Sequence, residues 1–159
     1  MLRVGKLTDY ATVMAARMAR EPERVFAAAE LAAAGHVGVP TASKILKLLT
    51  RARLLNSVRG AKGGYVLARS AAEISLAQVI AALEGPTGLT ECSAAAGLCT
   101  QEGCCEIRSH WRAIDRVLRD ALDHTTLADL CGPAPVTEFV PTFAPAPVRQ
   151  GHPATGGNT

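Results

Sequence analysis

The sequence predicts a mainly α fold: a winged helix-turn-helix domain with a small β-hairpin wing, followed by a long dimerisation helix. Three patterns predict it: capped apolar runs at helical spacing, a glycine-rich segment between two short strand-forming runs, and a later apolar run with alternating steps of four and three. The chain has 159 residues, of which 48% are hydrophobic and 4% aromatic. Such a chain can bury one modest core, so we expect one compact domain with an appendage.

Two helices are expected near the N-terminus. Thr8 and Asp9 can cap the first, which should end at the Glu21-Pro22 step. An alanine-rich run over residues 27–33 predicts a second, short helix that Gly35 stops. A short loop and a further helix follow, in the order that a helix-turn-helix requires.

A third helix should begin at Pro40 and run to about Leu55, because proline suits the first turn of a helix. One face of this helix is apolar and the other is polar and basic, so the polar face suits the phosphates and base edges of DNA. The inward stripe is Ile45, Leu48, Leu49 and Ala52. The candidate DNA-binding residues of the outward face are Thr41, Ser43, Lys44, Lys47 and Arg51.

A glycine-rich segment predicts the wing. Residues 56–59 and 65–69 are expected to form two short strands around a tight tip at residues 60–64. Arg59 and Lys62 give the wing a positive charge, and we expect that one or the other could enter the minor groove of DNA.

Two more helices follow the wing. Ser75 and Gln78 form a capping-box pattern, so residues 76–84 should be helical. Further on, an apolar seam with steps of four and three predicts a helix that packs along another helix, which we interpret as a homodimer contact. An amphipathic helix folded onto its own domain is the alternative. The seam residues are Ile107, Trp111, Ile114, Leu118 and Ala121.

These patterns divide the chain into four parts. Residues 1–86 form the DNA-binding domain and residues 87–106 a cysteine-rich loop. Residues 107–131 hold the dimerisation helix and a short docking helix, and residues 132–159 are rich in Pro, Ala, Gly and Thr, as in a disordered tail.

The charge is unevenly distributed. Residues 1–90 carry twelve Lys/Arg against six Asp/Glu, whereas residues 91–159 carry five against eight. No carboxylate lies between Glu30 and Glu73, an interval with seven basic residues. A solvated helix face usually mixes both signs, so this stretch favours a polyanionic partner, namely double-stranded DNA.

Other classes of function have little support in the sequence. No apolar stretch is long enough to cross a bilayer and the N-terminus lacks a secretory signal, so we expect a cytoplasmic protein without a membrane partner. No nucleophile and base pairing or phosphate loop stands out, so we expect no enzymatic activity and no small-molecule substrate.

Four of the five cysteines lie within fourteen residues, at Cys92, Cys99, Cys104 and Cys105. In a reducing compartment such crowding indicates metal or redox chemistry and not a disulfide framework. The wide spacing lacks the paired hooks typical of structural zinc sites. An iron–sulfur cluster tolerates wider spacing and a non-thiolate corner, so it is the favoured cofactor.

Several motifs together resemble one family over about residues 1–130. They are KLTDYA, VPTASKILKLL, RGAKGGYVLAR, ISLAQVIAALEG, the cysteine loop and TLADL. The chain thereby resembles the Rrf-two family of bacterial winged-helix transcription regulators, of the IscR, NsrR and RirA type. The cysteine loop followed by IRSHWRAI most resembles the branch that regulates Suf iron–sulfur cluster assembly.

The resemblance implies particular ligands. In that branch two residues typically separate the third cysteine from an arginine, which selects Cys105 over Cys104. Cys92, Cys99 and Cys105 are therefore the implied metal and cluster ligands. Asp9 matches the position from which the nitric-oxide-sensing branch supplies an oxygen ligand from the other subunit. His110 is the alternative fourth ligand, and either a 2Fe–2S or a 4Fe–4S cluster is compatible with the resemblance.

The implied function is a homodimeric repressor or activator that binds a palindromic promoter operator and responds to cluster, iron or redox status. Three alternatives remain. The chain could be a nitric-oxide-sensing repressor of the same family, a thiol- or zinc-dependent DNA-binding regulator without a cluster, or an electron-transfer protein.

Overall fold

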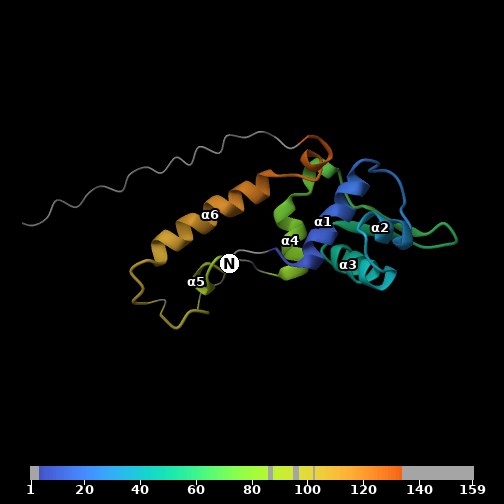
Figure 1. The fold of residues 1–159 in the computed structure, drawn as a ribbon. Coiled ribbons are helices and arrows are strands. Elements are labelled where there is room, and N and C mark those ends of the chain that lie inside the picture. Colours follow the sequence, from blue (N-terminus) through green and yellow to red (C-terminus); the bar gives the residue numbers. More distant parts are fainter. Residues whose placement is uncertain (1–3, 86–87, 95–96, 102, 134–159) are drawn as a thin grey trace, which may run out of the picture.

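The computed structural model describes residues 4–85, 88–94, 97–101 and 103–133. It confirms the predicted fold class, since the described chain is mainly helical with one two-stranded antiparallel hairpin. Helices α1 to α4 and the hairpin form one body, and α6 extends away from it (Figure 1). The elements are α1 (Lys6–Ala19), α2 (Ala28–Ala34), α3 (Val39–Arg51), β1 (Leu55–Val58), β2 (Gly64–Leu67), η1 (Ala71–Glu73), α4 (Leu76–Glu84), α5 (Glu91–Ala94), α6 (Arg108–His124) and η2 (Asp129–Cys131).

The core lies between α1, α2, α3 and α4. Met14 and Met18 of α1, Leu31 of α2, and Ile45 and Leu49 of α3 are all at most 1% exposed. Complete burial of one such side chain contributes about 1.5–3 kcal/mol. The inward orientation predicted for the last two residues is confirmed, and it directs the opposite face of α3 outward.

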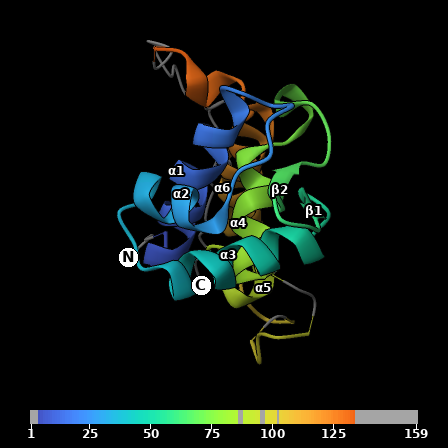
Figure 2. The ribbon, with the colours of Figure 1, turned by 90° about the vertical axis from the view of Figure 1, so that its right-hand side faces the viewer.

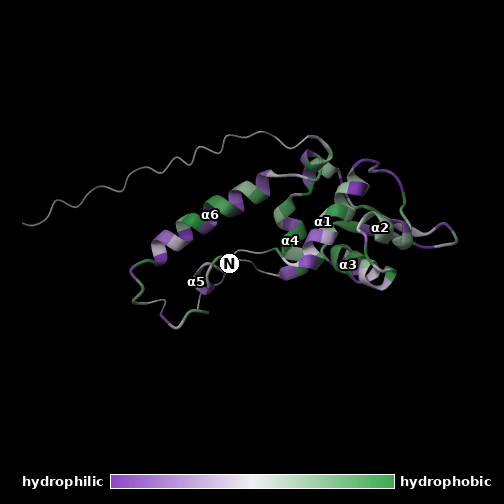
Figure 3. Ribbon diagram, in the orientation of Figure 1, coloured by the Kyte–Doolittle hydropathy of each residue, from purple (hydrophilic) through white to green (hydrophobic). Residues whose placement is uncertain are grey.

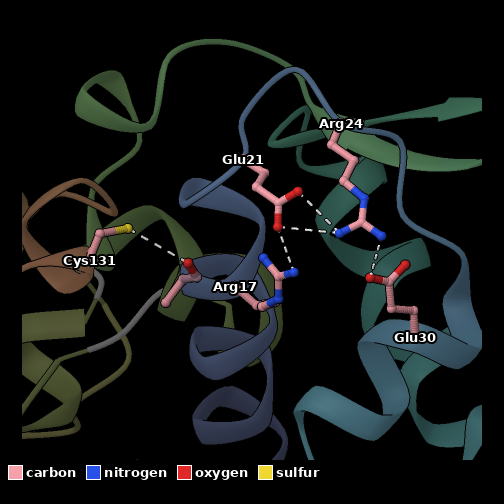
Figure 4. Close-up of polar contacts among 6 residues, drawn as sticks. Arg17, Glu21, Arg24, Glu30 and Cys131 are labelled. Atoms are coloured by element: carbon pink, nitrogen blue, oxygen red, sulfur yellow. Dashed lines mark hydrogen bonds and ion pairs between the residues drawn. The ribbon is translucent and has the colours of Figure 1, made fainter.

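The segment that follows α6 returns to this core. Leu127 is 1% exposed, and its N–H donates to the carbonyl of Ile74 at 2.9 Å. The thiol of Cys131 lies 3.7 Å from the carbonyl of Ala16 on α1 (Figure 4). The C-terminal end of α6 is therefore tied to the first body through this segment.

Helix α1 begins at Lys6, earlier than a cap at Thr8 or Asp9 predicts. Its N-cap is Gly5, and neither Thr8 nor Asp9 caps it. The Thr8 hydroxyl donates instead to the Glu84 carboxylate at 2.6 Å, and the Gly5 N–H donates to the same oxygen at 2.8 Å. A carboxylate from the last turn of α4 thus accepts a hydrogen bond from the backbone at the start of α1. The predicted cap residue would have supplied such an acceptor from its own side chain.

Helix α3 ends at Arg51, four residues before the predicted end. Arg53 has a φ of 59°, which no helix can continue. Leu55 already belongs to β1, where it pairs with Leu67, and both side chains are buried. Ala52 is therefore exposed instead of inward-facing, and both strands begin one residue earlier than predicted.

A third segment pairs with β2 near the tip end of the hairpin. Phe26 and Tyr65 form an antiparallel bridge, with hydrogen bonds of 2.8 and 2.9 Å. A Cβ atom on Gly64 would lie 2.2 Å from the Phe26 carbonyl oxygen, so only glycine permits this approach. The bridge fixes the wing to the loop between α1 and α2.

Ion pairs hold that loop in place (Figure 4). Glu21 pairs with Arg17 at 2.6 Å and with Arg24 at 3.2 Å, and Arg24 also pairs with Glu30 at 2.7 Å. The two guanidinium groups lie 5.1 and 4.6 Å from the centre of the buried Phe26 ring. These arginines stabilise the fold and are neutralised there, so they are poor candidates for phosphate contacts.

Candidate nucleic-acid interface and metal centre

Helices α2 and α3 form the helix-turn-helix. The turn is short because Gly35 ends α2 and His36 adopts a φ of 52° before Gly38 begins α3. Val39 and Pro40 occupy the first turn of α3 and are exposed. This geometry leaves the N-terminal end of α3 accessible, as a recognition helix requires.

The outward face of α3 carries the predicted polar and basic residues. Lys44, Lys47 and Arg51 are exposed, and Thr41 and Ser43 are half-buried beside them. In the described part of the chain, all ion pairs of this domain are made by Arg17 and Arg24, so the three cations of α3 have no carboxylate partner there. The face therefore combines free positive charge with short hydrogen-bonding side chains.

The wing lies next to α3 and adds two more cations. Contacts join α3 to β1, and the hairpin follows the C-terminal end of α3 (Figure 2). Arg59 and Lys62 are exposed at its tip, where Gly60 has a φ of 118°. A helix face and an adjacent basic hairpin present two surfaces that suit two neighbouring grooves of DNA.

Arg69 has a different role from the other basic residues of this interval. Its guanidinium donates to the carbonyls of Glu73 at 3.1 Å and Arg53 at 3.2 Å, and to the side chain of Gln78 at 2.8 Å. Gln78 is itself part of the capping box of α4. Arg69 thus braces the base of the wing against α3 and α4, which its place in a basic stretch did not predict.

The cysteine loop joins α4 to α6. Cys99 and Cys105 are half-buried and Cys104 is exposed, and all three are free thiols. The backbone of Cys92 lies in α5, but its side chain is outside the described part. Among the described side chains, no group of three His, Cys, Asp or Glu residues is gathered as a metal site.

The two candidates for the fourth ligand lie on different helices. Asp9 is exposed in the first turn of α1, and His110 is exposed in the first turn of α6, with its Nδ1 3.5 Å from the Ser109 hydroxyl. Within one chain the structure does not bring either of them together with Cys99 and Cys105. The choice between them stays a prediction.

Helix α6 presents an apolar face to solvent. It has 17 residues, with hydrophobic residues on one side and hydrophilic residues on the other (Figure 3). None of the described helices has the length and apolar character to span a membrane. A row of large apolar side chains on a helix face is normally covered by another part of the protein or by a partner. The exposed fractions are 58% for Ile107, 38% for Trp111, 45% for Ile114, 52% for Val117 and 38% for Leu118.

One buried side chain of α6 was missed by the sequence patterns. Asp115 is only 6% exposed, and its carboxylate accepts hydrogen bonds from the Leu89 N–H at 3.0 Å and from Arg119 at 2.6 Å. Arg119 also donates to the Ser93 carbonyl at 3.2 Å. The i,i+4 spacing of Asp115 and Arg119 signals an ion pair, but nothing local signals the contact with residues 89–93.

With this geometry established, the family of the chain follows from a direct comparison. The family model named Rrf2, iron-dependent transcriptional regulator, matches residues 4–133. The chain belongs to the Rrf2 family. The resemblance to this family that the sequence motifs indicated is confirmed. The family is one of transcriptional regulators, in agreement with the expectation that the chain is not an enzyme.

Individual relatives and structures agree with the Rrf2 assignment. A helix-turn-helix type transcriptional regulator of Mycobacterium tuberculosis H37Rv is 36% identical over 105 residues, which are 66% of this chain and 65% of the relative. CymR, the global cysteine regulator of B. subtilis, has a TM-score of 0.66 and 26% identity over 82% of this chain and 97% of its own. IscR of T. potens has a TM-score of 0.64 and 26% identity over 81% of this chain and 85% of its own.

Proposed function

We propose that this Rrf2 chain is a cytoplasmic homodimeric transcription regulator that binds DNA and senses its signal through an iron–sulfur cluster on the cysteine loop. The observation that carries the proposal is the exposed, carboxylate-free basic face of α3 in a chain that also carries a loop of free thiols. Its targets are the genes of Suf iron–sulfur cluster assembly, and its signal is cluster, iron or redox status.

DNA binding uses α3 and the wing. Lys44, Lys47 and Arg51 contact phosphates or guanines in the major groove, and Thr41 and Ser43 reach base edges. Arg59 or Lys62 enters the minor groove. In a two-fold dimer the two recognition helices read half-sites about 34 Å apart or a multiple of that distance, so the operator is an imperfect palindrome.

The dimer is formed through α6. Its exposed seam has the spacing of helix–helix packing, and its burial removes apolar side chains from water. A two-fold axis then places the same face of both chains in contact. This contact leaves α3 and the wing free for DNA.

The donor set of the loop fits an iron–sulfur cluster in its chemistry. Cys99 and Cys105 are free thiols outside the helices and strands, so their thiolates are available to iron. Together with Cys92 they would hold the cluster, and Asp9 of the other subunit, or else His110, would hold the fourth corner. A bound cluster supplies a centre that oxygen, nitric oxide or iron loss can alter, and a single non-thiolate corner makes it labile.

The chain connects this site to two helices, α6 and α1. The carbonyl of Cys105 accepts the Arg108 N–H at 3.4 Å, so the third thiol lies directly before the first turn of α6. Glu84, at the end of α4 before the loop, binds the start of α1, where Asp9 lies. A change in the loop can therefore alter both helices, which is the linkage that a sensor requires.

The ligand assignment is tested with two neighbouring variants. After anaerobic reconstitution with iron and sulfide, Cys105→Ala should abolish the visible absorbance of the cluster, whereas the matched variant Cys104→Ala should keep most of it. The opposite pattern would move the third ligand to Cys104. Wild-type protein that takes up no iron would refute the cluster.

A second candidate function rests on the exposed Cys104 next to Cys105. Adjacent thiols of this kind can serve an oxidised neighbour as resolving partners or bind zinc. The protein would then be a colourless regulator that binds DNA and contains zinc or responds to oxidants. Metal analysis of the purified protein separates the two candidates.

A further inference from the structure

The middle of α6 holds the loop segment that contains Cys92. Asp115 is the one described residue of α6 that is buried, although most of the helix faces solvent. A buried carboxylate is costly unless its oxygens are paired, and both are: one accepts the Leu89 N–H and the other accepts Nε of Arg119. Asp115 is therefore placed to bind this particular segment.

Arg119 completes the contact from the other side of Cys92. Its Nη2 donates to the carbonyl of Ser93 at 3.2 Å while its Nε holds Asp115. Leu89 lies three residues before Cys92, and Ser93 directly follows it. The two side chains thus fix the backbone on both sides of the cysteine, an arrangement that we call the α6 latch.

The helix in this segment is very short. Helix α5 has only four residues, Glu91–Ala94, and a helix of this length is unstable by itself. Local bonds join Thr90 to Ser93, and they cannot orient the turn relative to the rest of the protein. Bonds from α6 to Leu89 and Ser93 supply that orientation.

The same turn of α6 also carries the exposed seam. Ile114 directly precedes Asp115, and Leu118 directly precedes Arg119, with exposed fractions of 45% and 38%. In this part of α6 the charged residues Asp115 and Arg119 therefore face the cysteine loop, and the apolar residues Ile114 and Leu118 face solvent.

We propose that Asp115 and Arg119 are positioning residues for the metal site, which orient Cys92 and connect the cysteine loop to the dimer face of α6. This inference rests on the proposed cluster function. Outer residues that orient the ligands of a metal typically change its affinity by about 10- to 100-fold. The latch should act on the retention of iron, and not on the stability of the DNA-binding body.

The first test measures iron loss from the reconstituted full chain. Asp115→Ala removes both hydrogen bonds of the buried carboxylate, and we expect iron release to a chelator to accelerate by about 10- to 100-fold. Arg119→Lys keeps the charge but loses the second donor, so it should also release iron faster than wild type. The control is Asp120→Asn, an exposed position of the same helix, which should match wild type. Release from Asp115→Ala at the wild-type rate would overturn the inference.

The second test needs no metal. In the apoprotein, hydrogen exchange of residues 88–94 should be faster in Asp115→Ala than in wild type, while exchange in α1 to α4 stays the same. Equal exchange in residues 88–94, or faster exchange throughout the protein, would overturn the latch. If wild-type protein binds no iron, the proposed function is refuted. The hydrogen-exchange comparison still tests whether Asp115 holds residues 88–94 in place.

Discussion

The exposed seam of α6 gives a quantitative prediction for Ile114→Glu. Ile114 is 45% exposed in the single chain and lies at the centre of the seam. Complete burial of an isoleucine contributes about 1.5–3 kcal/mol, so covering the exposed half contributes roughly 1 kcal/mol. A two-fold interface contains the residue twice, which gives about 2 kcal/mol per dimer. This alone raises the dimer dissociation constant about 30-fold, and the desolvation of two glutamates adds to it.

Sedimentation equilibrium over a range of concentrations measures this change. The matched control is Ser109→Glu, which adds the same charge at an exposed position about 140° around the helix from Ile114. The control should dimerise like wild type, whereas Ile114→Glu should be mainly monomeric at concentrations where wild type is dimeric. An unchanged dissociation constant for Ile114→Glu, or equal weakening by both variants, would refute the reasoning.

Three further predictions concern the interface and the core. Lys47→Ala should weaken binding to all DNA sequences similarly and lower the salt slope by about 0.9 for one lost phosphate contact, and an unchanged slope in filter-binding titrations would remove Lys47 from the contacts. Hydrogen bonds from the Thr8 hydroxyl and then the Gly5 N–H lower the pKa of Glu84 below its usual value. The ionised carboxylate therefore stabilises the fold at pH values above its unfolded-state pKa, and this stabilisation is lost as the pH falls through the lower folded-state pKa. The free energy of unfolding of wild type should exceed that of Glu84→Gln by about 1 kcal/mol at neutral pH, and the difference should vanish in strong acid. Urea unfolding at both pH values measures this, and a difference that does not vary with pH would contradict it. Leu127→Ala should cost about 2–5 kcal/mol in the free energy of unfolding, and a loss within 1 kcal/mol would show that the return segment adds little to the core.

Local patterns in the sequence predicted much of the fold. The helix Leu76–Glu84 has the predicted bounds because the capping box of Ser75 and Gln78 lies entirely within four residues. The buried stripe of α3 was evident because helical spacing alone separates Ile45 and Leu49 from the basic face. The boundaries shifted where a distant group intervened.

The missed features depend on contacts that the folded chain makes and that no local pattern signals. Thr8 binds Glu84 across 76 positions, and Asp115 binds Leu89 across 26. Arg69 is one more cation by composition, and only the folded chain shows that carbonyl and amide oxygens surround it. Spacing identifies which residues can bind metal or DNA, but it does not identify the residues that hold them in position.

The coupling of the cysteine loop to DNA binding is tested most directly by titrating a palindromic promoter operator with the cluster-loaded and the cluster-free protein, both kept without air. We expect the loaded protein to show visible cluster absorbance and an operator affinity different from that of the cluster-free form. A colourless protein whose DNA affinity is the same with and without iron would contradict the proposal, and it would leave a regulator that depends on thiols or zinc.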